Sequence, residues 1–215
     1  NSNGITDGTI VPADLAVSGP LSGFRNLLIN GNPTINQRGY VSGTNTSGAN
    51  QYTLDRWRVV TSAQNITFTT SAGICTVTAP AGGVEQVVEG ASILGGTYVL
   101  SWTGTATATV NGTSVGNGGT ISLTGGSNAT VRFSSGTFSQ AQLEFGSVAT
   151  SFEQRPYGVE LLLCQRYYEV VSYPSFYVPN TTATQMYVPV YYKVTKQAAP
   201  VVTLPSSTTA AYNAG

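Results

Sequence analysis

Short runs that alternate apolar residues with hydroxyl-bearing residues are the feature that most limits the folds open to this chain. They recur from residue 55 to residue 147 and are separated by turn sequences such as NG, GNGG and TGG. In DRWRVV, Trp57 and Val59 fall on one face, and in NITFTT, Ile66 and Phe68 do so. Alternation with a period of two is typical of strands that bury one face. Such short, regularly spaced strands predict an all-β chain built as a jelly-roll β-sandwich.

Several further segments carry the same pattern. Strands are expected in ICTVTA, TYVLSWTG, TATATV, GTISLTG, ATVRFSS and AQLEFGS. No charged residue occurs between Glu89 and Arg132, so Thr and Ser hydroxyls must cover the polar strand faces. Neutral faces lack the charged residues that usually protect edge strands from pairing with another chain. Association into an oligomer would cover such edges.

Charge excludes several classes of partner. The 215 residues include nine acidic and nine basic side chains, so no basic surface favours nucleic acid, and no apolar run is long enough to insert into a membrane.

The only methionine is Met186, the chain begins at Asn1, and it ends in SSTTAAYNAG without a closing element. We therefore expect further sequence on both sides of this chain.

The absence of histidine limits catalysis. Ser-His-Asp and Cys-His arrangements are impossible, and most transition-metal sites lose their usual ligand. A glycosidase would need two carboxylates, and the pairs close in sequence are Glu85 with Glu89 and Glu144 with Glu153. Polar groups on strand faces that bond to their neighbours are the commoner case. We therefore predict no catalytic residues.

Metal, cofactor and disulfide sites are weakly supported. Four side chains could offer oxygens to a structural calcium ion, namely Asn26, Asn30, Asp55 and Glu144, but no loop of regularly spaced acidic residues accompanies them. We predict neither a metal nor a cofactor. Cys75 and Cys164 permit one disulfide, although separated cysteines in an apolar context are more often buried thiols.

The chain divides into four parts. Residues 1–23 contain too little apolar surface for a core and are expected to be a linker. Residues 24–158 carry the sandwich pattern, with turn signals at Asn30-Gly31 and Asn32-Pro33. Residues 159–172 contain ELLLCQRYYE, the one stretch that favours a helix, and are expected to form a short connector. Residues 173–215 are expected to form a second, smaller and incomplete β domain, with a strand in QMYVPVYYKV.

Aromatic side chains are concentrated after the predicted helix. Sugars stack their C–H faces on exposed aromatic rings, and their hydroxyls bond to amides. The candidate receptor-binding residues are Tyr173, Phe176, Tyr177, Asn180, Gln185, Tyr187 and Tyr191. Tyrosine is equally enriched at subunit interfaces, so packing between protomers remains an alternative.

A second group of residues is assigned to structural roles. Trp57 and Trp102 are expected in the core, and Asp55 and Arg56 are expected to form a hydrogen-bonded pair, because Arg presents a rigid fork to a carboxylate.

Three stretches together resemble the distal regions of bacteriophage tail fibres and prophage tail proteins. They are GITDGTIVPADLAVSG, NLLINGNPTINQRGY with YTLDRW, and AQLEFGSVATSFEQRPYGVELLLCQRYYE. The resemblance implies a shaft end at residues 1–23, a jelly roll similar to carbohydrate-binding modules, and a connector that leads into a final β domain. It also implies a homotrimer in the virion tail fibre, attached to the remainder of the fibre and in contact with the host cell surface.

The resemblance also assigns roles within the connector. It implies that Leu162, Leu163 and Tyr167 dock on the sandwich, while Arg166 and Glu169 pair on the helix surface at i, i+3 spacing.

Three functions follow as hypotheses. The first is non-catalytic adsorption to a bacterial surface glycan or outer-membrane receptor. The second is a structural connector, with receptor binding or a chaperone function located beyond residue 215. The third is a carbohydrate-binding module of a secreted glycosidase, which the fibre-like leading segment disfavours.

Overall fold

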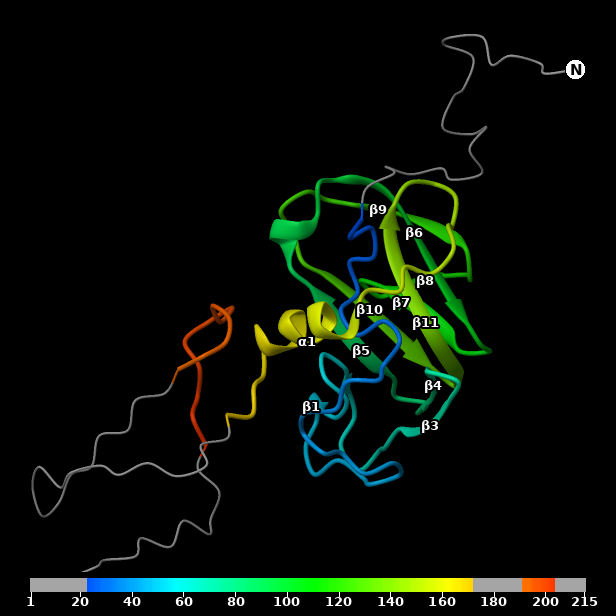
Figure 1. Ribbon diagram of the computed structural model, residues 1–215. Helices are drawn as coiled ribbons and strands as arrows, with labels where there is room; N and C mark the ends of the chain where they lie inside the picture. Colours follow the sequence, from blue (N-terminus) through cyan, green and yellow to red (C-terminus); the bar gives the residue numbers. More distant parts are fainter. Residues whose placement is uncertain (1–22, 172–190, 204–215) are drawn as a thin grey trace, which may run out of the picture.

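The computed structural model describes residues 23–171 and 191–203, and it shows two antiparallel sheets and one α-helix (Figure 1). A six-stranded sheet has the order β1-β2-β5-β10-β7-β8, and a five-stranded sheet has the order β3-β4-β11-β6-β9. The all-β prediction is confirmed at this level. No helix in the described ranges is long and apolar enough to cross a membrane.

The eleven strands of the described structure are short, and each belongs to one of the two sheets. The six-stranded sheet contains β1 (Gln51–Tyr52), β2 (Arg58–Val59), β5 (Val84–Val88), β10 (Ala129–Ser134), β7 (Thr107–Val110) and β8 (Thr113–Val115). The five-stranded sheet contains β3 (Thr67–Ser71), β4 (Ile74–Ala79), β11 (Gly136–Phe145), β6 (Gly96–Thr103) and β9 (Gly119–Leu123). A short 3-10 turn (Gly90–Ser92) precedes β6, and α1 (Tyr157–Gln165) follows β11.

Aromatic rings from both sheets form the centre of one shared core. Phe133 of β10 stacks on Phe138 of β11 with ring centroids 4.4 Å apart. The Trp57 ring lies 5.0 Å from Phe138 and 5.9 Å from Phe133, and the Trp102 ring meets Phe133 edge-on at 5.3 Å. Both tryptophans are buried, as expected. The two sheets therefore pack face to face through offset and edge-on ring contacts.

The alternating pattern placed most strands correctly but missed β1, β5 and β8. In β4, Cys75 and Val77 point into the core, while Ile74 is 38% exposed. In β5, the inward residue between Val84 and Val88 is Gln86, whose side chain hydrogen-bonds to the backbone of residue 29 at 2.8 Å through both its oxygen and its nitrogen. An inward polar residue hides the period of two, which is why the sequence pattern did not reveal this strand.

Strand β11 changes partner along its length. Residues 136–138 pair with β4, and from Ser139 onward the strand pairs with β6, with a register shift between Ser139 and Gln142. The second half of β11 also hydrogen-bonds to the chain that enters the sandwich at residues 27–31. Leu27 N–H donates to Leu143 O, and Ala141 N–H donates to Gly31 O. A Cβ atom at residue 31 would lie 2.3 Å from the carbonyl oxygen of residue 141, so only glycine fits there.

Helix α1 begins and ends earlier than predicted. Pro156 at its N-terminus has φ −55°, which already suits a helix, and Glu160 supplies an acidic side chain to the first turn. The helix ends at Gln165 and does not continue through the RYYE sequence.

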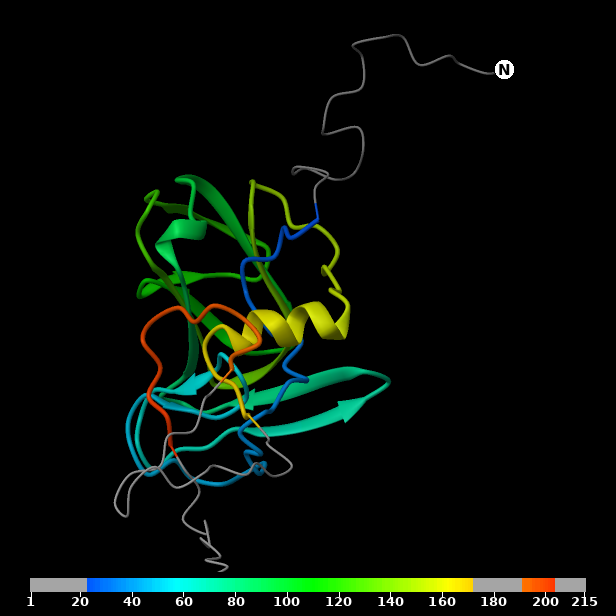
Figure 2. The same ribbon diagram turned by 60° about the vertical axis from the view of Figure 1, so that its left-hand side comes forward.

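The predicted distal β domain lies mostly outside the described residues. Its described part, residues 191–203, contains no strand, and the C-terminal end of the strand expected in QMYVPVYYKV is therefore not formed at residues 191–194. In two views of the molecule, the described chain starts at one end of the sandwich and the residues after α1 run toward the other (Figures 1 and 2).

Candidate functional site

A buried asparagine organises the loop that precedes β1. Asn30 is fully buried with φ 57°, and its side-chain amide donates to the carbonyl oxygens of Ile35 and Asp55 at 3.0 Å. Its side-chain oxygen accepts from Ile35 N–H, and its carbonyl oxygen accepts from Trp57 Nε1 at 2.9 Å. Asparagine tolerates the left-handed conformation that this turn requires. The turn predicted at Asn30-Gly31 is confirmed, and it fixes the position of the core tryptophan.

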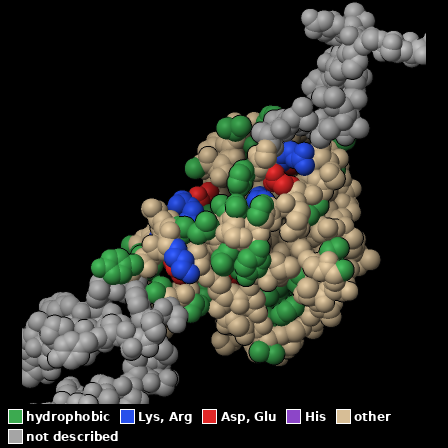
Figure 3. Space-filling model, viewed as in Figure 1, with side chains coloured by type: hydrophobic (Ala, Val, Ile, Leu, Met, Phe, Trp, Pro, Cys, Tyr) green, Lys and Arg blue, Asp and Glu red, His purple; other side chains and the backbone are tan. Residues whose placement is uncertain are grey.

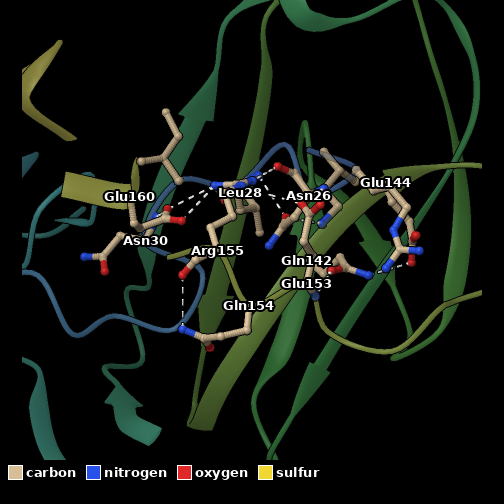
Figure 4. Close-up of polar contacts among 12 residues, drawn as sticks. Asn26, Leu28, Asn30, Gln142, Glu144, Glu153, Gln154, Arg155 and Glu160 are labelled. Atoms are coloured by element: carbon tan, nitrogen blue, oxygen red, sulfur yellow. Dashed lines mark hydrogen bonds and ion pairs between the residues drawn. The ribbon is translucent and has the colours of Figure 1, made fainter. Parts of the chain in front are cut away.

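Arg155 joins the first residues of the sandwich to the helix. Its Nη1 lies 3.0 Å from both carboxylate oxygens of Glu160, and its Nε lies 3.5 Å from Glu153 Oε2 (Figure 4). Its Nη2 donates to the carbonyl oxygen of Asn26, and the carbonyl oxygen of Leu28 lies 3.4 Å away. The Arg155 side chain is only 6% exposed. One guanidinium therefore holds together the incoming chain, the loop after β11 and α1.

A small pocket opens beside Arg155. Its volume is about 40 Å³, and Phe152, Tyr157 and Asn32 are among its lining residues. Ligand pockets are generally about 300–1,000 Å³, so this one has room for a few water molecules and not for a sugar ring. The contacts of Arg155 therefore form a structural junction.

The consecutive tyrosines after α1 each cover an arginine. The Tyr167 ring centroid lies 3.5 Å from the guanidinium carbon of Arg56, and the Tyr168 centroid lies 3.7 Å from that of Arg38. Stacked Arg–Tyr contacts stabilise by about 0.5–2 kcal/mol each, more where water is excluded. The RYYE sequence therefore attaches the end of the helix to the loops on either side of β1.

Asp55 and Arg56 do not form the predicted pair. Asp55 Oδ1 lies 3.3 Å from Arg38 Nη1 and accepts from Gln37 N–H at 3.1 Å. Arg56 has φ 72°, and its Nη2 donates to the carbonyl oxygen of Val87 on β5. Burial raises the pKa of Asp55 above its usual range, although Gln37 and Arg38 favour the carboxylate. Adjacent residues in this turn thus send their side chains to different partners.

The buried face of α1 differs from the one expected. Leu162 is 46% exposed and Leu163 is partly buried, so docking of Leu162 on the sandwich is wrong. Cys164 and Gln165 are buried instead, because the packed face includes residues 160, 161, 164 and 165, one turn apart. Burial raises the pKa of the Cys164 thiol, and both cysteines of the chain are buried and free.

The predicted ion pair between Arg166 and Glu169 is also replaced. Arg166 Nη2 lies 3.2 Å from Glu89 Oε2, and the Tyr167 hydroxyl donates to Glu89 Oε1 at 2.5 Å. Burial alone would raise the pKa of Glu89, but the bonds from Tyr167 and Arg166 outweigh it and lower that pKa. Because the helix ends at Gln165, the i, i+3 spacing of Arg166 and Glu169 no longer places them on one helix face.

Tyr167 supplies a pH-dependent prediction. Burial, with the hydrogen bond to Glu89, raises its pKa to about 12, above the value of about 10 expected in the unfolded chain. Its contribution to stability is therefore complete below pH about 10 and is lost as the pH rises toward about 12. In a tyrosinate absorbance titration, Tyr167→Phe should remove a component near pH 12. Glu89→Gln should instead move that component to lower pH, and a profile unchanged by both substitutions would contradict the assignment.

Lys196 attaches the described C-terminal segment to α1. Its Nζ donates to Gln165 O at 2.6 Å and to Glu169 Oε2 at 2.5 Å, and the Tyr192 ring lies 4.8 Å away. A cation at the last carbonyls of a helix also complements the helix dipole. Gln197 N–H donates to the carbonyl oxygen of residue 166 at 3.0 Å. Residues 191–203 are thus held against the end of the helix.

Removing this lysine should release the segment. With Lys196→Met, we expect amide hydrogen exchange at residue 197 to accelerate at least about tenfold, because two charge-assisted hydrogen bonds are lost. Lys193→Met is the matched control, since that exposed residue contacts Glu169 through its backbone N–H. Equal exchange rates in the two variants would show that Lys196 does not hold the segment.

Most of the predicted receptor-binding residues lie outside the described residues. They are Tyr173, Phe176, Tyr177, Asn180, Gln185 and Tyr187. Tyr191 is described and is 74% exposed, at the start of the segment held by Lys196.

The candidate acid and base residues are held by neighbouring polar groups. Glu144 accepts from Gln142 Nε2 at 2.8 Å and from the Thr150 hydroxyl at 2.7 Å. Gln142 and Glu144 therefore share a face, as predicted, beneath the loop that follows β11. Glu153 accepts from Asn26 N–H at 2.9 Å. These are the contacts with neighbouring polar groups that are common for carboxylates on strand faces.

The oxygens proposed as calcium ligands also have protein partners. Asn26 Oδ1 accepts from the backbone N–H groups of Leu28 and Leu143 at 3.0 and 3.2 Å. Asn30, Asp55 and Glu144 accept hydrogen bonds from other groups, as described above. Among residues 23–171 and 191–203, no group of three or more His, Cys, Asp or Glu side chains is placed to hold a metal ion.

A charged group that the sequence did not reveal lies on the outer face of the six-stranded sheet. Glu85 Oε1 accepts from Arg58 Nη2 at 2.6 Å, and Glu85 Oε2 lies 2.7 Å from Arg132 Nη2. Glu85 is only 2% exposed, whereas the Arg132 side chain is 41% exposed. The three charged residues can be read from the sequence, but only the order β2-β5-β10 in the sheet brings them together. On the face of the molecule seen in Figure 3, charged side chains are few, and most lie beside one of opposite sign.

No family model, no curated protein and no solved structure matches this chain.

Proposed function

We propose that this chain is a non-catalytic module of a bacteriophage or prophage tail fibre that mediates attachment to a bacterial surface receptor. The observation that carries the proposal is that the second and third of the stretches that resemble tail fibres lie in contact with each other. Segments 26–40, 52–57 and 152–169 join through Arg155, the Arg–Tyr stacks and Asn30. This junction lies where the chain passes from the sandwich toward its aromatic-rich segment.

The arrangement suits a module placed in line within a fibre. The described chain begins at one end of the sandwich and continues from α1 toward the other (Figures 1 and 2). Lys196 and Glu169 anchor the segment that follows the aromatic-rich stretch. A fixed base of this kind would present Tyr173, Tyr177 and their neighbours to a glycan or an outer-membrane protein.

We infer finer features that agree with this role. The two antiparallel sheets around one core support a jelly roll similar to carbohydrate-binding modules. Residues 173–215 would form a smaller distal β domain, and the fibre would be a homotrimer at the tip of the virion tail. The absence of charge between Glu89 and Arg132 supports association, since two sheet edges would otherwise stay neutral and unprotected.

A structural connector is the second candidate. It is favoured by the junction itself, where the pocket is too small for a sugar and each polar contact joins one chain segment to another. In that case receptor binding or a chaperone function would belong to sequence beyond residue 215.

Competition for adsorption separates the two candidates. Purified, folded chain that labels host cells and blocks phage adsorption would support the receptor-binding function. A chain with three times the protomer mass by light scattering that does neither would support the connector. Release of reducing sugar from host polysaccharide would contradict the non-catalytic assignment.

Single substitutions then separate receptor contacts from subunit contacts. Tyr177→Ala and Tyr187→Ala should abolish cell labelling while leaving the oligomer mass unchanged. If the oligomer dissociates, and cell labelling returns when the chains are joined by a heterologous trimerisation segment, these tyrosines form the interface instead.

A further inference from the structure

The outer face of the six-stranded sheet carries a continuous row of polar side chains. Cross-strand register places Arg58 beside Glu85, Glu85 beside Arg132, Arg132 beside Thr109, and Thr109 beside Ser114. These five residues, hereafter the polar row, come from β2, β5, β10, β7 and β8 in spatial order. With neighbouring strands about 4.8 Å apart, the row is about 19 Å long.

The polar row has an excess of one positive charge. Both guanidiniums approach Glu85 through their Nε and Nη2 edges, at distances of 2.6 to 2.9 Å. In the described structure the Nη1 groups of Arg58 and Arg132 have no hydrogen-bond partner, and these side chains are 27% and 41% exposed. Two cations that share one carboxylate leave outward donors for a second anion.

The orientation of Arg132 is fixed by the residue beneath it. A Cβ atom at Gly83 would lie 2.7 Å from Arg132 Cδ and 2.8 Å from Arg132 Cγ, so the aliphatic part of Arg132 lies flat on the glycine backbone. Glu85 then holds the guanidinium from the other side. A donor fixed before binding loses little conformational entropy when it binds a ligand.

The other half of the polar row offers hydroxyls rather than charge. Thr109 is partly buried and Ser114 is exposed, and Thr107 and Thr130 lie on the same outer face. A hydroxyl both donates and accepts hydrogen bonds, as do the hydroxyls of a sugar. A lipid headgroup or a simple anion would use the arginines and leave these side chains unused.

We propose that the polar row binds an acidic polysaccharide lying across the strands, with a hexuronate carboxylate bridging Arg58 and Arg132 and sugar hydroxyls bonded to Thr109 and Ser114. This site is separate from the aromatic-rich segment after α1. The proposed polysaccharide binding rests on the proposed adhesion function only in that both concern a cell surface.

Direct binding to purified polymers tests the inference without host cells. The full chain should bind at least one of polygalacturonate, polymannuronate and hyaluronate by calorimetry, and should not bind the methyl ester of that polymer. Arg132→Gln should weaken binding about tenfold or more, since a charge-assisted hydrogen bond is lost. Ser114→Ala should weaken it by a smaller factor. Glu85→Gln should strengthen it, because the competing carboxylate is gone while a hydrogen-bond acceptor remains.

A second arginine of similar exposure is the control that distinguishes binding at the polar row from general attraction to positive charge. Arg166 is 39% exposed, close to the 41% of Arg132, but its ion pair is with Glu89 and it lies outside the polar row. Arg166→Gln should leave the affinity unchanged. Equal losses for Arg132→Gln and Arg166→Gln, equal binding to the methyl ester, or binding to none of the three polymers by folded chain would each overturn the inference.

The same measurements keep this inference distinct from the adhesion proposal. Host-cell labelling that survives Arg132→Gln, with no uronate binding, would refute the polar row and leave adhesion intact. Uronate binding by a chain that does not label cells would support the polar row and contradict adhesion.

Discussion

Arg155→Met is expected to lower the free energy of unfolding by about 3–5 kcal/mol, because removal of one partner leaves a mostly buried carboxylate without its counter-charge. Glu160, with its side chain 14% exposed, would lose both contacts at 3.0 Å. The carbonyl oxygens of Asn26 and Leu28 would lose a donor at the same time. Methionine replaces the aliphatic stem of arginine with an apolar chain of similar reach, so the loss reports the guanidinium together with the space that it fills.

Urea denaturation of the purified chain measures this effect. Arg166→Met is the control, because that arginine is 39% exposed and a surface ion pair is generally worth no more than about 1 kcal/mol. Adding Glu160→Gln to Arg155→Met should recover part of the loss, since no buried charge then remains. Equal losses for the two arginine variants would show that the junction does not stabilise the fold.

Trp57→Ala is expected to cost about 3–5 kcal/mol, the range found when a large aromatic residue is deleted from a core. The substitution removes the ring that contacts Phe133 and Phe138, which belong to opposite sheets. It also removes the donor to the carbonyl oxygen of Asn30, the residue that fixes the loop before β1.

Trp57→Phe separates packing from hydrogen bonding. It keeps a ring between the sheets but leaves the Asn30 carbonyl without its donor, which should cost about 1–3 kcal/mol. Denaturant and thermal unfolding should therefore rank Trp57→Phe between the native chain and Trp57→Ala. If Trp57→Phe were as costly as Trp57→Ala, the hydrogen bond rather than the rings would account for the stability.

Features that neighbouring residues determine could be predicted from the sequence, and features that depend on a distant partner could not. Alternation within a few residues was enough to predict the strands that carry Val77 and Phe133 and to place Trp57 in the core, because strand faces are set by a period of two. Strand β5 escaped because Gln86 faces inward, where its amide bonds to the backbone of residue 29. Burial of a polar group is decided by a distant partner, which no local pattern records.

The polar contacts show the same limit more clearly. Arg166 and Glu169 have helical spacing, yet the helix ends before either residue and each pairs with a side chain distant in sequence. The pairing of Asp55 with Arg38 rather than Arg56 depends on the turn at residue 56. Glu85 meets two arginines only because β5 lies between β2 and β10. Side chains suited to ion pairs can be recognised from the sequence, but their partners depend on topology.

Arg155 also has a mechanical consequence. If tension is applied between residue 24 and the residues after α1, a short path connects the two points: the Asn26 carbonyl, the Arg155 guanidinium and the Glu160 carboxylate. The first residues are also hydrogen-bonded to β11 in the interior of the five-stranded sheet, so pulling must shear several bonds together rather than peel a free edge. Force would therefore pass along one side of the sandwich, and the strands that carry Arg58, Arg132 and Ser114 would remain unstrained.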